Sequence, residues 1–181
     1  MSKEFAARRL DVKAFAEEGA HLHGEQPLRE HDRLMAETER RGAGSAVHWS
    51  ATGELRNPRH VHPEIWVHLQ SDAILPLTCQ RCLLPVDVPV SVDRSFRFVP
   101  DEEMAAAQDE QSEEDVLALS RSLDLVELVE DELLMELPLA PRHEACPEPL
   151  KLAVADEDFE EASAPRENPF ALLGKLKGGK P

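Results

Sequence analysis

The sequence predicts an α+β fold in which an antiparallel β-meander, or a partly open barrel, is covered on one side by helices and carries a flexible acidic loop and a C-terminal tail. Two observations predict it. Three consecutive segments alternate apolar and polar residues, and a later segment has apolar residues at helical spacing. We expect a single α+β domain over residues 1–150, an acidic linker over 151–167, and a short amphipathic helix with a basic tail over 168–181.

The first element expected is a short helix over residues 28–41, which follows Pro27 and precedes Gly42. Its apolar residues recur at helical spacing, and arginines occupy its last turn. From Ala46 the period changes to two, and the same alternation returns at Ile65 after an Asn-Pro turn signal. Both of these segments therefore predict strands.

The clearest strand is expected over residues 86–98, where valines and phenylalanines fill one face and mostly polar residues fill the other. Arg94 interrupts the apolar face. Pro89 has no N–H group to donate to a neighbouring strand, so this strand should lie at an edge of the sheet or carry a bulge.

An acidic segment and a helix follow this strand. Residues 101–115 contain eight carboxylates and no basic residue, which predicts a flexible or marginally helical loop. Asp124 and Glu127 then have the spacing of a capping box. The apolar residues that follow at helical spacing predict a helix that ends before Pro138.

The end of the sequence combines a linker with an amphipathic segment. Residues 157–167 are acidic and contain proline and alanine, which predicts a linker. Asn168 is a suitable N-cap, and Pro169 suits the first position of a helix. This helix would either pack back onto the core or present Phe170 and Leu173 to a groove on a partner.

Negative charge is concentrated in the second half of the chain. Residues 1–100 carry 13 basic and 14 acidic side chains, whereas residues 101–181 carry 7 and 22, which together give the formal net charge of −16. Such a surface repels the phosphate backbone of nucleic acids at long range and attracts basic proteins. The charge distribution therefore favours a protein partner over general RNA binding.

Several classes of function lack support in the sequence. The longest apolar stretches are too short to span a bilayer, and the first residues do not form a secretion signal, so we expect a cytoplasmic protein without membrane association. The sequence contains no phosphate-binding loop, nucleophile elbow or metalloprotease motif. We therefore expect neither an enzyme nor a small-molecule substrate.

The cysteines provide the most informative motif. Cys79 and Cys82 form a C-x-x-C turn between two predicted strands, and His143 and Cys146 have the same spacing after the predicted helix. Together they predict a Cys3His site for one structural zinc ion. Two alternatives remain: a hairpin with small buried cysteines, and redox chemistry, which the strand-like flanks disfavour because a reactive C-x-x-C begins a helix.

Two other sets of polar residues are interpreted as surface features. Histidines two positions apart occur at 21 and 23 and at 60 and 62, but neither pair has an evident third ligand nearby. The acidic residues between positions 127 and 132, among them Glu130, are expected to form the solvated face of a helix rather than a catalytic site.

Taken in order along the chain, these motifs resemble the YceD family, the bacterial large ribosomal RNA subunit accumulation proteins. The matching features are the early segment 24–34, L-T-C-Q-R-C-L at 77–83, the strand that ends in F-R-F, D-L-V-E-L-V-E-D-E-L-L-M-E-L-P-L at 124–139, His143 with Cys146, and N-P-F-A-L-L-G-K-L-K at 168–177. The resemblance implies a role in the synthesis, processing or stability of 23S ribosomal RNA, without catalytic activity.

Two hypotheses of different class follow. The first is a noncatalytic ribosome-biogenesis factor that acts through a ribosomal or ribosome-biogenesis protein, and this partner carries the RNA specificity. The second is a zinc-knuckle module that binds 23S ribosomal RNA or its precursor directly. The residues expected at a partner or RNA contact are Arg81, Arg97, Asn168, Pro169, Phe170, Leu173, Lys175 and Lys177.

Overall fold

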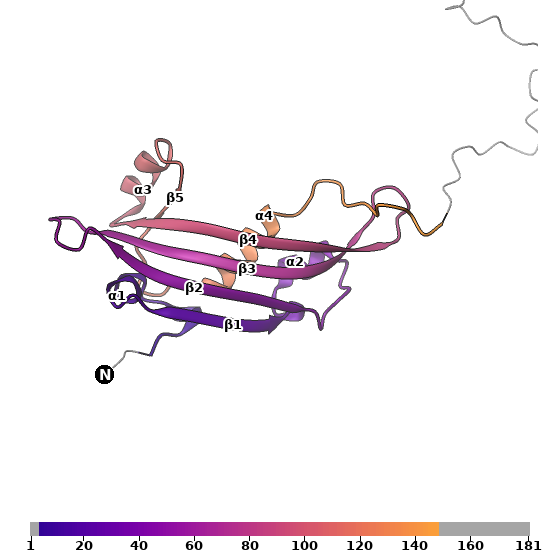
Figure 1. The fold of residues 1–181 in the computed structure, drawn as a ribbon, viewed down its shortest axis with the longest axis horizontal. Coiled ribbons are helices and arrows are strands. Elements are labelled where there is room, and N and C mark those ends of the chain that lie inside the picture. The colour runs from indigo at the N-terminus through magenta and orange to yellow at the C-terminus, as the bar shows by residue number, and fades with distance from the viewer. Residues whose placement is uncertain (1–3, 149–181) are drawn as a thin grey trace, which may run out of the picture. The chain divides into compact units, whose positions relative to one another are not determined.

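The structure is a computed structural model that describes residues 4–148 (Figure 1). The predicted linker over 151–167 and the predicted helix over 168–181 lie outside the described residues. The elements in chain order, together with 3₁₀ turns at Ala7–Arg9 and Leu28–Glu30, are α1 (Val12–Glu17), β1 (His21–Pro27), α2 (Asp32–Glu37), β2 (Ala46–Arg56), β3 (Glu64–Thr78), β4 (Pro85–Val99), α3 (Glu102–Asp109), β5 (Asp115–Ala118) and α4 (Leu125–Met135).

The strands form one open sheet in the order β1-β2-β3-β4-β5. Each of the first four strands pairs antiparallel with its neighbour in the sequence, and β5 pairs parallel with the end of β4. The predicted α+β class is therefore confirmed. Of the two predicted forms of the sheet, the structure has the open meander and not the barrel.

The pairing register places the apolar residues of the strands on one face of the sheet. Val67 lies opposite Phe96, and Ala73 lies opposite both Val47 and Val90. Phe15 of α1 and Val129 of α4 are fully buried against this face. The large side chains that share this core include Leu10, Leu28, Leu34, Trp49, Leu69, Leu75, Phe98, Leu125 and Leu133.

Helices α1 and α4 contact the strands on the core face, and α2 packs against α4. In Figure 1 both α2 and α4 lie behind the sheet. The carboxylate of Asp124 accepts hydrogen bonds from the backbone N–H groups of Val126 and Glu127 at 3.0 and 3.1 Å, which confirms the predicted start of α4. No helix among the described residues is long and apolar enough to cross a membrane.

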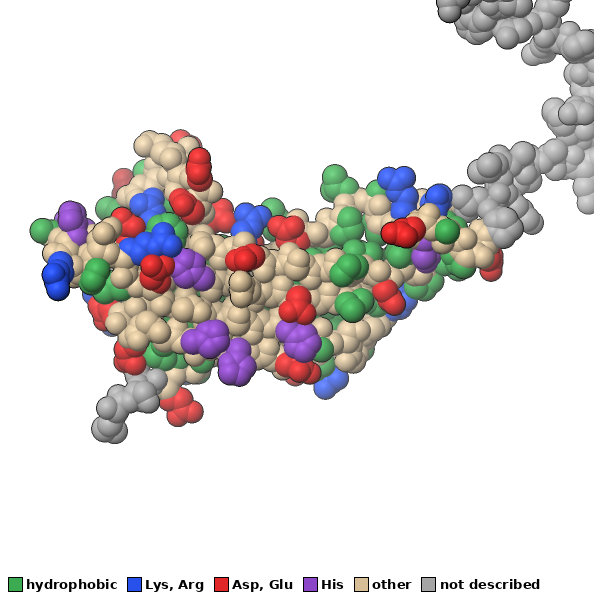
Figure 2. All heavy atoms as spheres, viewed as in Figure 1, with side chains coloured by type: hydrophobic (Ala, Val, Ile, Leu, Met, Phe, Trp, Pro, Cys, Tyr) green, Lys and Arg blue, Asp and Glu red, His purple; other side chains and the backbone are tan. Residues whose placement is uncertain are grey.

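The opposite face of the sheet is mostly polar. Figure 2 shows histidine and carboxylate side chains gathered over the strands on this face. His21 and His23 stack with ring centroids 5.8 Å apart, and His68 bridges Glu54 and Ser95 through its two ring nitrogens at 2.6 and 2.7 Å. The histidines at 21 and 23 thus lie on the surface of a strand.

The sequence predicted that the strand with Pro89 lies at an edge of the sheet or carries a bulge, and the edge position is confirmed. Pro89 lies opposite Ile74 of β3, whereas β5 pairs with β4 only from Phe96 to Val99. The first part of β4 is therefore a free edge within the described residues, where a missing N–H group costs no ladder hydrogen bond.

Arg94, which interrupts the apolar face of β4, is explained by its charged neighbours. Its guanidinium lies 3.3 Å from Glu136 and 3.6 Å from Glu132, both near the end of α4, and 3.8 Å from Asp115 of β5. The arginine therefore lies at the border of the core, where α4 and β5 supply carboxylates.

The helix predicted over residues 28–41 is wrong in extent. Only α2 is α-helical there, because Glu39 and Arg40 adopt left-handed backbone conformations with φ of 52° and 61°. The acidic segment over 101–115 contains a helix, α3, whose N-cap is the Asp101 carboxylate, and the chain continues into β5. Strand β1, helix α1 and strand β5 had no counterpart among the predicted elements.

Candidate metal centre

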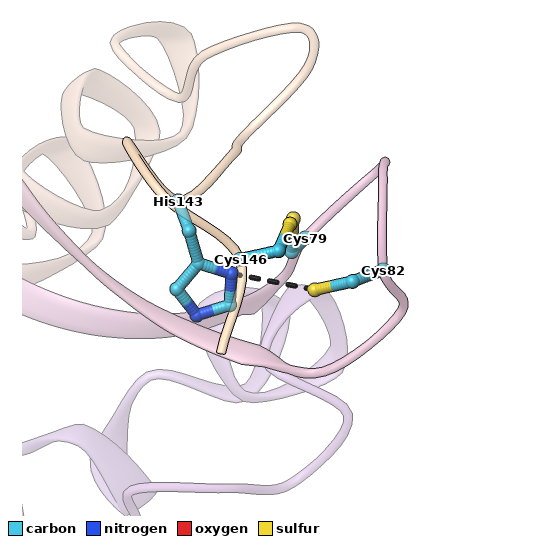
Figure 3. A group of neighbouring side chains, drawn as sticks. All are labelled: Cys79, Cys82, His143 and Cys146. Carbon is cyan, nitrogen blue, oxygen red and sulfur yellow. Dashed lines mark hydrogen bonds between the residues drawn. The ribbon is translucent and has the colours of Figure 1, made fainter. Parts of the chain in front are cut away.

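Cys79, Cys82, His143 and Cys146 lie together at one end of the sheet (Figure 3). Cys79 follows β3, Cys82 precedes β4, and the other two lie in the segment after α4. One ligand atom from each residue lies within 4.8 Å of the other three. The structure thus brings together two pairs of residues that are separated by about sixty positions in the sequence.

The loop between β3 and β4 presents the first two sulfurs. The backbone N–H of Cys79 donates to Leu84 O at 2.9 Å, and the N–H of Leu83 donates to Cys79 O at 2.9 Å. Leu83 has a φ of 62°, a left-handed conformation that reverses the chain within the loop. The tight turn brings the sulfurs of Cys79 and Cys82 within 4.8 Å of each other.

The segment after α4 is joined to this loop by the backbone. The N–H of Gln80 donates to Pro141 O at 2.8 Å. This contact lies next to Cys79 on one side and two residues before His143 on the other. It therefore sets the second pair of candidate ligands, His143 and Cys146, beside Cys79 and Cys82.

The hydrogen bonds of His143 determine which ring nitrogen can bind a metal. Nε2 lies 3.0 Å from Pro85 O, a carbonyl oxygen that can only accept, so Nε2 carries the proton. In the neutral ring, Nδ1 then keeps its lone pair, and it lies 3.4 Å from Cys82 Sγ. Such an outer hydrogen bond fixes the tautomer and orientation of metal-binding histidines in many proteins.

The pKa values of the Cys79 and Cys82 thiols are shifted in opposite directions. Burial raises the pKa of Cys79, but hydrogen bonds from the backbone N–H groups of Cys82, His143 and Arg81 outweigh it and lower that pKa to about 5. Burial raises the pKa of Cys82, and the neighbouring sulfurs of Cys146 and Cys79 raise it further. The lowered pKa of Cys79 favours its thiolate form, and a metal cation would favour ionisation of the other sulfurs.

The donor set suits a tetrahedral zinc ion, and one distance between its atoms can be compared with the ideal value. With Zn–S distances of about 2.3 Å and Zn–N distances of about 2.0–2.1 Å, ligand atoms lie roughly 3.5–3.8 Å apart. The Cys82 Sγ to His143 Nδ1 distance of 3.4 Å is close to this value. Among the described residues, no other group of three or more histidine, cysteine or acidic side chains brings its ligand atoms together closely enough to hold a metal ion.

The other interpretations of the cysteines fit the geometry less well. Cys79 is fully buried, but Cys82 and Cys146 are partly exposed, so the three are not simply small residues filling a core. The C-x-x-C lies in a loop between two strands and not at the start of a helix, where thiol oxidoreductases place it.

The structure places the arginines predicted for partner contact in different settings. The Arg81 guanidinium lies against Cys146. Arg97 lies on the polar face of β4, and its Nε is buried without a hydrogen-bond partner among the described residues. It lines a shallow polar pocket of about 400 Å³ with Glu64 and Glu114. The remaining predicted contact residues, from Asn168 to Lys177, lie outside the described part of the chain.

Sequence reasoning missed two parts of this arrangement. The carbonyl groups of Pro85 and Pro141 accept hydrogen bonds that orient the segment with His143 and Cys146, and a backbone acceptor leaves no signal in a motif. The contact of Arg81 with Cys146 was also missed, because Cys146 lies 65 positions away in the sequence.

The fold and the cluster together define a small α+β protein with an open sheet and a Cys3His centre that links a β-hairpin to the segment after the last described helix. The model of the family described as "Large ribosomal RNA subunit accumulation protein YceD" matches residues 67–177, which is more than half of the chain and includes all four residues of the cluster. The chain belongs to the YceD family.

A relative with the same description, from Haemophilus influenzae, is 32% identical over 104 residues. The aligned part covers 56% of this chain and 59% of the relative, so the chain matches less than two thirds of that protein's length. No solved structure matches the chain.

Proposed function

We propose that this chain is a noncatalytic factor that supports the accumulation of 23S ribosomal RNA in the cytoplasm, that it acts through a protein partner, and that its Cys3His centre holds one structural zinc ion. The observation that carries the proposal is the family match, because the family is described by the accumulation of large-subunit ribosomal RNA. The match extends across the cluster and α4.

Charge supports a protein partner. The second half of the chain has a formal net charge of −15, which attracts basic proteins and repels phosphate. Arg81, one of the cations available for RNA, directs its guanidinium to Cys146 and to the carbonyl groups of His143 and Glu144. Arg97 lies in a pocket with two carboxylates. Both arginines are therefore poorly placed to track a phosphate backbone.

The zinc ion would act as a structural link. Its ligands come from the β3–β4 loop and from the segment after α4, so binding would join the sheet to the end of the helical layer. The chemistry that zinc supplies in such a site is coordination that stabilises the fold, with all four positions filled by protein. The residues of this chain that would hold it are Cys79, Cys82, His143 and Cys146.

Depletion of the protein in its own host tests the cellular role. We expect mature 23S ribosomal RNA to fall, or its precursors to accumulate, relative to 16S ribosomal RNA from the same cells. Unchanged 23S levels and unchanged precursors would show that the proposed role is wrong.

A pull-down of the full chain from lysate, with and without nuclease, separates the two routes to RNA. A ribosomal or biogenesis protein that stays bound after nuclease treatment would support the proposed partner. Loss of all proteins after nuclease, together with a low-salt RNA shift that weakens in Arg97→Ala, would instead support a direct RNA-binding zinc-knuckle module.

Metal analysis of the purified chain tests the zinc site. We expect about one zinc per chain, loss of that zinc in His143→Ala, and retention in His60→Ala, which removes an exposed histidine from the β2–β3 loop. Absence of zinc from the wild-type protein after purification with added zinc would overturn this part of the proposal.

A further inference from the structure

Arg81 joins the two halves of the cluster. It lies between Cys79 and Cys82 in the hairpin loop, and its side chain reaches the segment after α4. Nε donates to Cys146 Sγ at 3.1 Å, and Nη2 donates to the backbone oxygens of His143 at 2.9 Å and Glu144 at 3.4 Å. One guanidinium thus contacts a ligand sulfur and the carbonyl groups that precede it.

The charge of the proposed metal centre explains why a guanidinium would be favourable at this position. Three thiolates and a neutral histidine around a divalent ion carry a net charge of −1, and the guanidinium reduces the total to zero. A hydrogen bond to a thiolate also lowers the electron density at that sulfur, because the N–H is held by a permanent cation. Arg81 therefore satisfies both the charge and the geometry of the second pair of ligands.

The neighbouring Arg142 provides a contrast. It precedes His143 directly, yet its side chain is exposed and makes no hydrogen bond or ion pair within the described residues. Proximity of an arginine to the cluster is therefore not enough to place a guanidinium on a sulfur, and the three contacts of Arg81 are specific to its position in the loop.

We propose that Arg81 is an outer positioning residue of the metal centre, which neutralises the centre and holds the segment 143–146 in place to bind the ion. This inference rests on the proposed zinc site and assigns Arg81 to that site, in place of the RNA or partner contact expected from the sequence. Removal of the guanidinium would leave the four ligands present but weaken their hold on the metal.

The test measures zinc affinity by competition with a chromogenic chelator for the full-length wild type, Arg81→Gln, Arg81→Lys and Arg142→Gln. We expect Arg81→Gln to bind zinc about 10- to 100-fold more weakly, as for outer-shell variants of other zinc sites. Arg81→Lys should be intermediate, because an ammonium group keeps the charge but lacks the planar fork. Arg142→Gln should remain within about 2-fold of the wild type, because it breaks no hydrogen bond in the structure.

Cobalt substitution gives a second readout. The thiolate-to-cobalt absorption band should shift in Arg81→Gln and not in Arg142→Gln, since only the former loses a hydrogen bond to a ligand sulfur. Equal zinc affinity and equal spectra for wild type and Arg81→Gln would overturn the role of Arg81 and leave the zinc site standing. Equal losses in the two glutamine variants would also overturn it, and a wild type without zinc would reject the site itself.

Discussion

The indole ring of Trp49 packs across Gly24, its partner on the neighbouring strand. A Cβ atom at Gly24 would lie 2.6 Å from this ring, whose Nε1 also donates to Gln26 at 2.8 Å. The ring is thus fixed on one side by the core and on the other by a hydrogen bond, and it has little room to move.

Gly24→Ala should therefore destabilise the protein by about 1–3 kcal/mol, the usual cost of overpacking a core. Gly44→Ala is the matched control, because nothing lies within 4 Å of the Cβ it would add. Its effect should be within about 0.5 kcal/mol. Urea denaturation measures both free energies of unfolding, and equal effects of the two substitutions would contradict the packing argument.

His31 is a buried histidine whose Nε2 has no hydrogen-bond partner among the described residues. Burial lowers its pKa, as does Arg8, whereas Glu130 and Glu30 oppose this shift. Because the folded pKa lies below the unfolded value of about 6.5, the unfolded state binds more protons as the pH falls below this value. Protonation of His31 therefore favours unfolding.

The free energy of unfolding should fall between pH 7 and pH 5 by up to about 1.4 kcal/mol per pH unit from this residue. His31→Gln should remove that part of the pH dependence, and His60→Gln, at an exposed position, should leave it intact. Denaturant titrations at several pH values give the comparison. Parallel curves for wild type and His31→Gln would show that His31 does not titrate on unfolding.

For the candidate site, the types and spacing of Cys79, Cys82, His143 and Cys146 allowed their grouping into one cluster to be predicted, and the structure brings these four candidate ligands together. The sequence did not allow the direction of the Arg81 side chain to be predicted, because its acceptors lie more than sixty residues away in the segment 143–146. Long-range partners of a loop residue depend on the whole fold, which no local pattern encodes.

At the level of secondary-structure elements, helices α2 and α4 are joined by a buried carboxylate. Glu130 of α4 is only 8% exposed, so its expected place on a solvated helix face is wrong. Its Oε1 accepts from the backbone N–H groups of Arg33 and Leu34 at 2.8 and 3.1 Å, near the start of α2. It therefore satisfies donors that a helix leaves unpaired at its N-terminus.

Glu130→Ala should cost about 2–3 kcal/mol, because it leaves the backbone N–H groups of Arg33 and Leu34 without their acceptor and removes one of the two carboxylates that pair with the Arg33 guanidinium. Asp131→Asn is the matched control on the same helix. Asp131 also pairs with Arg33 but has a side chain that is 47% exposed, so its loss should cost less than about 1 kcal/mol. Thermal unfolding followed by circular dichroism ranks the two, and a larger loss for Asp131→Asn would contradict this role of Glu130.

The elements that could be predicted are those with a long, regular apolar pattern. The strand over 86–98 and the helix after Asp124 match β4 and α4 closely. Strand β1 escaped prediction because its core-facing residues include Gly24 and Gln26, which provide no hydrophobic alternation. Strand β5 has four residues in acidic surroundings, and it is defined by its pairing with β4 rather than by its own sequence.

In the molecule as a whole, the proposed zinc ion would close a link between the start of β4 and the segment after α4. A ligand that binds only the folded state stabilises it by about 4 kcal/mol when its free concentration is 1,000 times its dissociation constant. Chelation should therefore lower Tm by roughly 10 °C at this size, and added zinc should restore it. Calorimetry tests this, and a Tm unaffected by chelator in a zinc-loaded sample would contradict a structural role.

One measurement tests whether the cellular role depends on the Cys3His cluster. It is the level of mature 23S ribosomal RNA in depleted cells that are complemented with variants expressed at equal amounts. Wild type and Arg142→Gln should restore the level, and Cys146→Ala should not, because it removes one of the four ligands. Full restoration by Cys146→Ala would contradict a functional metal centre, and a 23S level that does not respond to depletion would contradict the proposed function itself.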